Sequence, residues 1–124
     1  WRGTVAGAAG AAVAALVGGG SRPSDLRAAI GPAIGAADYA VGADVVDAVR
    51  ARWPGAADRW LAAGPSGPTF DLAGANRDQL IAAGLAADRV WACGHSTAAD
   101  RGRWYSHRAE GGRTGRQAAV IAWR

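Results

Sequence analysis

The sequence predicts an α/β fold of layered helices and strands, and three observations support this prediction. Helix-like stretches alternate with short apolar stretches along the 124 residues, an order of elements typical of helices packed on a sheet. No linker-like segment or internal repeat divides the chain, so we expect one domain at most. Large aliphatic residues and Phe number only twenty, and Ala supplies much of the 50% apolar fraction, so the core is expected to be thin.

Three helices are predicted, and each has local signals at its ends. Residues 4–17 are mostly small and are followed by three glycines, which favour the positive φ of a helix terminus. Residues 43–52 place their valines on one face, with Asp near the start and Arg near the end, where the helix dipole stabilises each charge. Asp71 is expected to cap a third helix over residues 73–83, which Gly84 ends.

Short strands are predicted before, between and after these helices. The last strand contains Val120 and Ile121 in an apolar run, which indicates burial on both faces of a sheet. Gly and Pro residues at 64–68 predict a turn between two of the strands. The predicted strands span residues 26–30, 59–62, 69–72, 89–93, 104–107 and 117–123.

Composition argues against a membrane segment and indicates a reducing compartment. The uncharged stretch at residues 4–20 is mostly Ala and Gly, whereas a spanning helix needs about 20 predominantly apolar residues. We therefore expect a buried helix of a soluble protein there, not a signal or membrane segment. The single Cys93 forms no disulfide framework, which indicates a cytoplasmic location. Because the chain has no Met, we expect that its numbering does not start at the natural initiator.

Charge is distributed unevenly along the chain. Residues 101–124 contain six Arg and a single acidic residue, Glu110, whereas residues 1–100 contain eight Arg and nine Asp. A basic segment of this kind faces an anion such as phosphate or nucleic acid, or it forms a solvated loop. Composition by itself favours the solvated loop.

Three residues of the chain have side chains of the type that binds zinc through nitrogen or sulfur, namely Cys93, His95 and His107. A zinc site with three ligands and Cys-x-His spacing is unusual, so we expect a buried Cys and two surface or hydrogen-bonding His instead. Asp71 is interpreted as a helix cap and not as a catalytic base. The residues themselves assign neither a metal site nor a catalytic group to this chain.

Short sequence blocks occur in a characteristic order from the first residue of the chain to the last. They are Trp1-Arg2-Gly3-Thr4, Ile30-Gly31-Pro32-Ala33-Ile34-Gly35, Tyr39-Ala40-Val41-Gly42, Phe70-Asp71-Leu72 with Asn76 and Gln79-Leu80, Cys93, Tyr105-Ser106-His107-Arg108, and Thr114-Gly115-Arg116 with Ile121-Ala122-Trp123. Each block is weak alone, but together the chain resembles the YfiH family, also called peptidoglycan editing factors or laccase-domain polyphenol oxidases.

The chain departs from the pattern of that family at three places. His107 stands where the family has Tyr, and Gly94 follows Cys93 where the family often has Thr. Residues 36–38 lack a Cys that often precedes the Tyr of the second block. These departures concern details of substrate recognition more than membership of the family.

The resemblance implies a fold, a cofactor and an activity. Residues 1–124 would be the C-terminal part of a single laccase-like domain, an α/β/α sandwich around a mixed sheet that is incomplete without the upstream half. A zinc or copper ion would be held by two His and one Cys, all upstream of Trp1. The implied activities are purine nucleoside phosphorylase and adenosine deaminase on adenosine, inosine or methylthioadenosine, and this fragment alone is expected to be inactive.

The implied partners are a purine nucleoside, phosphate and the N-terminal half of the same parent chain, with no nucleic acid and no membrane. Alternative functions are polyphenol oxidation and the editing of peptidoglycan precursors. A further alternative, of a different class, is a non-catalytic structural or anion-binding fragment.

Five residues are candidates for substrate binding within these blocks. Phosphorolysis needs a bound phosphate, and the Arg guanidinium provides charge-assisted hydrogen bonds for it. Hydroxyl groups beside the arginines can donate further hydrogen bonds, and a Tyr ring can stack on a purine. The alternative is that these arginines pair with carboxylates or the chain end and merely hold loops. The candidates are Arg2, Tyr105, Ser106, Arg108 and Arg116.

Overall fold

The computed structural model describes residues 1–121 and shows a mixed α/β fold, as the sequence predicts. Strand β1 (Ala28–Ile30) pairs in parallel with strand β4 (Val90–Ala92). Strand β2 (Leu61–Gly64) pairs antiparallel with strand β3 (Gly67–Phe70) through a tight turn. Within the described residues the strands therefore form two small sheets, each of two strands.

The first predicted helix is divided into two, because the chain turns at Gly7. Helix α1 (Arg2–Ala6) ends at Gly7, whose φ of 83° lies in the left-handed region, and helix α2 (Ala8–Gly18) begins directly after it. The Trp53 ring lies against Gly7, and its Nε1 donates a hydrogen bond to the carbonyl of Val5 at 2.9 Å. A contact with a residue distant in sequence therefore accompanies this break, which the local pattern does not predict.

The other two predicted helices are confirmed almost to the residue. Helix α3 (Ala43–Arg52) has the predicted bounds, and helix α5 (Leu72–Ala82) begins and ends one residue earlier than predicted. The Asp71 carboxylate accepts a hydrogen bond from the Gly74 backbone N–H at 2.8 Å, so Asp71 is the helix cap.

A short helix replaces the start of the strand predicted at residues 59–62. Helix α4 (Ala57–Trp60) forms there, and β2 begins only at Leu61. The helical turn places Trp60 in the core, where its Nε1 donates a hydrogen bond to Asp78 Oδ2 at 2.8 Å. The strand prediction is therefore wrong for this turn, because a tertiary contact of Trp60 outweighs the local pattern. Three single-turn 3-10 helices complete the elements, at Pro23–Asp25, Ala36–Asp38 and Ala87–Arg89.

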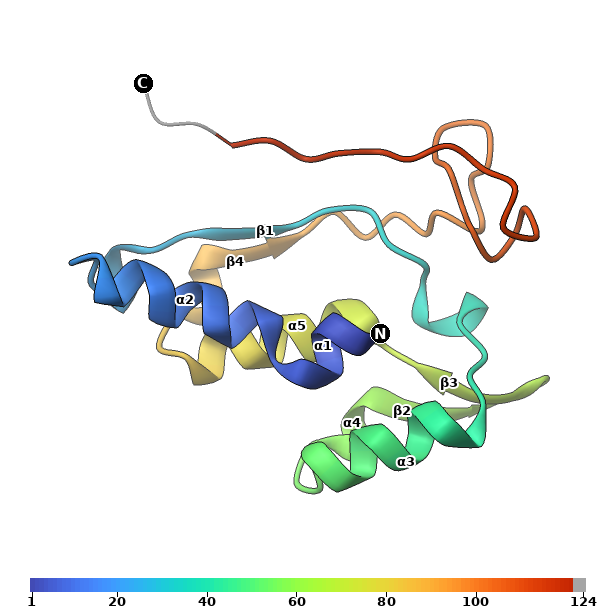
Figure 1. Cartoon of the computed structure of the whole chain (residues 1–124), viewed down its shortest axis with the longest axis horizontal. Helices are drawn as coiled ribbons and strands as arrows, with labels where there is room; N and C mark the ends of the chain where they lie inside the picture. Colours follow the sequence, from blue (N-terminus) through green and yellow to red (C-terminus); the bar gives the residue numbers. More distant parts are fainter. Residues whose placement is uncertain (122–124) are drawn as a thin grey trace.

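The elements form two small cores, so the sequence-based expectation of a thin core agrees with the structure. Helices α2 and α5 pack on β1 and β4 around the smaller core, which contains Val13, Leu85 and Val90. In Figure 1 the C-terminal segment passes above β1 and β4, whereas the helices lie below them. The larger core lies between α3, α4, α5 and the β2–β3 hairpin and contains Tyr39, Val45, Val49, Ala57, Trp60, Phe70 and Ala75.

Helix α2 is less buried than the sequence predicts. Of its eleven residues only Val13 is buried, and Leu16 is 52% exposed. A helix without charges on any face normally packs against protein on several sides. The expectation of a buried helix is therefore wrong for this chain taken alone. None of the helices that the structure describes has the length and apolar character needed to cross a bilayer.

The two predicted C-terminal strands are also wrong within the described residues. Trp104 lies in a bend and His107 in a turn, while Tyr105 and Ser106, like residues 117–121, have no regular secondary structure. Val120 is 91% exposed and Ile121 is 99% exposed, although burial on both faces was expected from their apolar run. A strand requires a partner for its backbone hydrogen bonds, and residues 117–121 pair with no strand in the described part of the chain. Residues 122 and 123 of this predicted strand lie outside the described residues.

Candidate functional site

Two adjoining cavities lie at the C-terminal loop (residues 104–117), and the first lies where this loop packs on the loop between β1 and α3. The first cavity has a volume of about 310 Å³ and is lined by Tyr39, Thr97 and residues 105–108 together with apolar neighbours. The second cavity, of about 290 Å³, is lined by residues 114–117, Tyr105 and His107. Both cavities share Tyr105, His107 and Gln117, so a molecule in one would lie beside a molecule in the other.

The C-terminal loop is held in shape by Glu110. Its carboxylate accepts hydrogen bonds from the Ser106 backbone N–H at 3.0 Å and from the Thr114 hydroxyl. The Ser106 carbonyl in turn accepts from the Glu110 backbone N–H at 3.0 Å. The hydrogen bond from Thr114, followed by the one from Ser106, lowers the pKa of Glu110 below its ordinary value. Glu110 therefore joins the two ends of the loop that carries His107 and Arg108.

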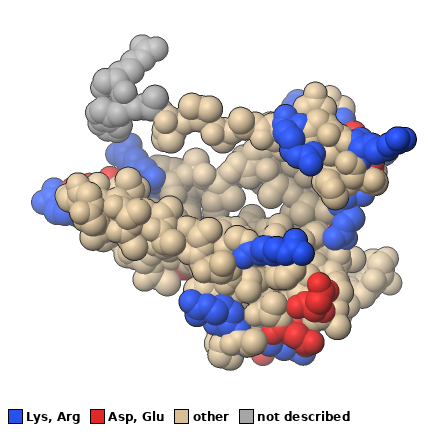
Figure 2. Space-filling model, in the orientation of Figure 1, with Lys and Arg blue, Asp and Glu red and all other residues tan. Residues whose placement is uncertain are grey.

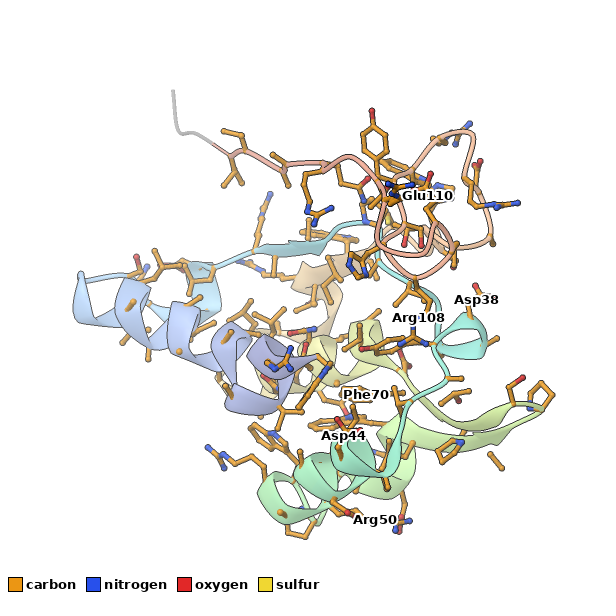
Figure 3. All side chains as sticks on the ribbon, turned by 45° about the vertical axis from the view of Figure 1, so that its right-hand side comes forward. Asp38, Asp44, Arg50, Phe70, Arg108 and Glu110 are labelled. Atoms are coloured by element: carbon orange, nitrogen blue, oxygen red, sulfur yellow. The ribbon has the colours of Figure 1, made fainter. Side chains whose placement is uncertain are left out.

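Arg108 connects this loop to the segment that follows β1. Its guanidinium lies 5.0 Å from the centre of the Tyr39 ring, and its Nη1 donates a hydrogen bond to the Ala40 carbonyl at 2.7 Å. Figure 3 shows Arg108 pointing from the C-terminal loop toward the segment near Asp38. Burial raises the pKa of Tyr39, while the positive charge of Arg108 opposes the rise. Arg108 therefore lines the first cavity and also holds two segments together.

Two glycines allow aromatic rings to lie close to the loop backbone. A Cβ atom on Gly115 would lie 2.7 Å from Tyr105 Cζ, so only Gly permits the observed position of this ring. Gly112 has a φ of 84°, and a Cβ there would lie 3.3 Å from His107 Nε2. The Tyr105 backbone N–H also donates to Gln117 Oε1 at 3.0 Å. Both rings are placed by glycine positions and face the cavities.

Four of the five predicted site residues are brought together, and the fifth lies apart. Tyr105, Ser106 and Arg108 line the first cavity, and Tyr105 and Arg116 line the second. Arg2 lines neither; its guanidinium lies 5.0 Å from the centre of the Trp1 ring, although its charge still acts on the pKa of Tyr39.

Five polar residues that line the cavities, Tyr39, Thr97, His107, Thr114 and Gln117, are not among the predicted site residues, and Thr114 too lies in a recognised block. Tyr39 and His107 lie inside blocks that were recognised, so their position in those blocks was an available signal. Thr97 and Gln117 carry no sequence signal that separates them from ordinary loop residues, because only the fold brings them to the cavities.

The cavities are suited to an anion. Arg108, Arg116 and His107 contribute basic groups to their walls, and none of the residues lining either cavity is an Asp or a Glu. Arg116 uses Nη1 for the carbonyls of Thr114 and Gly115, at 3.4 and 3.0 Å. Figure 2 shows basic side chains gathered over the C-terminal loop. The bound state of a phosphate or carboxylate would gain charge-assisted hydrogen bonds here.

Comparison with known sequences identifies the family. The sequence profile described as multi-copper polyphenol oxidoreductase laccase matches residues 1–124. The chain belongs to this family. It is 38% identical to the purine nucleoside phosphorylase YlmD of Geobacillus stearothermophilus, with 100% of this chain and 46% of the relative covered. It is 40% identical to a purine nucleoside phosphorylase of Deinococcus radiodurans, with 98% and 45% covered.

Solved structures of this laccase-like family have the same fold. The hypothetical protein YfiH of Bacillus licheniformis superposes with a TM-score of 0.85 at 33% identity, covering 93% of this chain and 44% of that protein. The YlmD structure from Geobacillus stearothermophilus has a TM-score of 0.83 at 37% identity. The chain therefore spans about half the length of the curated relatives that it matches.

The family name indicates a metal, but the described residues do not fit a metal centre. Among residues 1–121 no three His, Cys, Asp or Glu side chains lie close enough to hold an ion together. Cys93 is exposed, so the expectation of a buried Cys is wrong, and the His95 ring lies 6.1 Å from that of Trp104. We therefore assign no metal ligand within this part of the chain and derive no step through a metal.

Proposed function

We propose that this chain supplies the phosphate- and nucleoside-binding part of a purine nucleoside phosphorylase. Two relatives that it matches over nearly its whole length have that name. The observation that supports the proposal most directly is the pair of adjoining cavities, with basic groups in their walls and no lining carboxylate. The remaining part of the relatives' length would correspond to an N-terminal part of the same parent protein.

The two cavities match the two molecules that phosphorolysis consumes. A phosphate must approach the sugar carbon that carries the base, so the phosphate and nucleoside sites have to adjoin. In our proposal the second cavity binds phosphate through the Arg116 guanidinium. The first cavity binds the nucleoside, with the Tyr105 ring against the base and Ser106 and Arg108 at the polar wall.

The remaining parts of the proposal concern the metal, a second reaction and the compartment. In our proposal a zinc or copper ion is held by residues outside 1–124, where it would polarise a bound substrate. Adenosine deamination, with water in place of phosphate, is the second reaction. A cytoplasmic location agrees with a single Cys93 that forms no disulfide.

The experiment is a paired assay on the full-length parent protein. Arg116→Ala is expected to lower phosphorolysis of inosine by about 10- to 100-fold, the effect of one charge-assisted hydrogen bond of about 1.5–3 kcal/mol, with little change in adenosine deamination. Arg113→Ala is the matched control, because Arg113 lies in the same loop but lines neither cavity.

Arg108 provides an internal contrast for the same assay. Because Arg108 also holds Ala40 and the Tyr39 ring, Arg108→Ala is expected to lower both reactions together with the melting temperature. Equal losses of both reactions in Arg116→Ala, tracking stability, would return Arg116 to a purely structural role. Oxidation of a phenol in place of phosphorolysis would instead favour the polyphenol reaction that the family description names.

A further inference from the structure

His107 occupies a special place between the two cavities. Three residues line both of them, Tyr105, His107 and Gln117, and His107 is the one of the three whose side chain can carry a positive charge. Its neighbour Arg108 lines the first cavity, and Arg116 lines the second. An anion bound in either cavity could therefore contact the His107 side chain.

The His107 ring lies beside the backbone of its own loop. The His107 carbonyl accepts a hydrogen bond from the Gly112 backbone N–H at 2.8 Å, which closes the loop below the ring. Gly112 has positive φ and no side chain, and this leaves the space that the ring occupies beside it.

The charged side chains that line the cavities with His107 favour an anion there. From its own loop it is flanked by Arg108 and Arg116, while the Glu110 carboxylate is engaged by the Ser106 backbone N–H and the Thr114 hydroxyl and lines neither cavity. The segments packed against this loop contribute Tyr39, Ile34 and Thr97 to the first cavity and no carboxylate. A positive charge on His107 would therefore lack a carboxylate partner within the cavity walls until an anion bound.

We propose that His107, in its protonated form, binds the phosphate at the junction of the two cavities together with Arg116. This inference rests on the proposed function, because it concerns the same site, and it adds a second basic ligand for phosphate and a pH dependence. Imidazolium donates a charge-assisted hydrogen bond and neutral imidazole does not carry the charge. Phosphate affinity is therefore expected to fall as pH rises through the range in which histidines titrate.

Sulfate is the probe for this test, because phosphate itself changes charge near neutral pH and sulfate does not. Sulfate binding to the full-length parent protein is measured by calorimetry at about pH 5.5 and about pH 8, on either side of the histidine range. The dissociation constant is expected to rise by about tenfold between the two, which corresponds to losing one charged hydrogen bond.

Two substitutions of His107 and one control separate its charge from its shape. His107→Tyr, which installs the residue of the family pattern, should bind sulfate weakly and equally at both pH values. His107→Arg, which keeps a positive charge at both, should bind tightly at both. His95→Tyr is the control, because His95 lines neither cavity and should behave as the unmodified protein. Melting temperatures of all three confirm that the fold is retained.

The outcomes distinguish this inference from the proposed function. Sulfate binding that is independent of pH in the unmodified protein would overturn the role of His107, even if Arg116 still supported phosphorolysis. Loss of the pH dependence in His95→Tyr would overturn it as well. Conversely, pH-dependent sulfate binding that vanishes in His107→Tyr supports the anion site, and a protein with that behaviour but without phosphorolysis would refute the proposed function alone.

Discussion

Replacing Gly115 by Ala tests whether the Tyr105 ring contacts the nucleoside base. In the structure a Cβ at this position would lie 2.7 Å from Tyr105 Cζ and 2.8 Å from both Cε atoms. Ordinary carbon contacts begin near 3.5 Å, so the ring must move by roughly 0.7 Å or more. Tyr105 is 54% exposed, so the ring can swing outward without opening a core. The substitution should therefore change the cavity and leave stability nearly unchanged.

The magnitude follows from the contact that would be lost. Stacking of a base on an aromatic side chain contributes about 1–3 kcal/mol, which is roughly 5- to 100-fold in affinity. Gly115→Ala and Tyr105→Ala are therefore expected to raise the KM for inosine about tenfold and the KM for phosphate by less, because both residues also line the second cavity but supply no charge there. A selective effect on one substrate is the signature of a displaced ring, since a disturbed loop would affect both.

The assay is steady-state phosphorolysis by the full-length parent protein with inosine and phosphate varied in turn, accompanied by melting curves. Gly102→Ala is the matched control, because a Cβ there would lie 3.7 Å from Asp100 Oδ1, an ordinary contact. If Gly115→Ala has the same KM for inosine as Gly102→Ala, or if it raises both KM values equally, Tyr105 does not contact the base and our reasoning is refuted.

Three further predictions concern stability, ionisation and metal content. Phe70→Ala should lower the free energy of unfolding, measured by urea denaturation, by about 3–5 kcal/mol, because Phe70 is fully buried. Trp91→Ala should lower it by under about 1 kcal/mol, because Trp91 is exposed. Equal losses would contradict the assigned core. The NMR chemical shift of the Ser106 amide proton should change with pH, with a midpoint below the ordinary Glu pKa, because the pKa of Glu110 is lowered. Ionised Glu110 stabilises the loop above the ordinary Glu pKa, and this contribution is lost as pH falls through the lowered pKa. Glu110→Gln should abolish the titration, and a midpoint at or above the ordinary value would contradict the prediction. The dialysed 124-residue chain should contain well below one zinc per chain by elemental analysis, and stoichiometric zinc that is lost in Cys93→Ala would revive a site within the chain.

The family could be recognised, and several residues of the candidate site could be predicted, from sequence order alone. The blocks at residues 105–108 and 114–116 pointed to Tyr105, Ser106, Arg108 and Arg116, and the fold places all four on two adjoining cavities. Arg2 was selected by its place in a block, yet it lines neither cavity. A block records which residues occur together along a chain, and it does not record which way each side chain points.

Local signals by themselves determined the elements whose stabilising contacts are local. Helix α3 has its valines on one face and charges that suit its dipole, and α5 begins at the cap that Asp71 forms with Gly74. Each of these interactions joins residues within a few positions of one another. The sequence therefore determined both helices without knowledge of the rest of the fold.

Only the tertiary structure decided the features that depend on distant partners. The break at Gly7 accompanies the Trp53 ring, and the turn of α4 accompanies the bond from Trp60 to Asp78. Residues 117–121 are apolar enough for a strand, but a strand forms only where another strand meets its backbone groups. The cavities likewise arise because Arg108 joins a C-terminal loop to a carbonyl 68 residues earlier, a contact that no local pattern encodes.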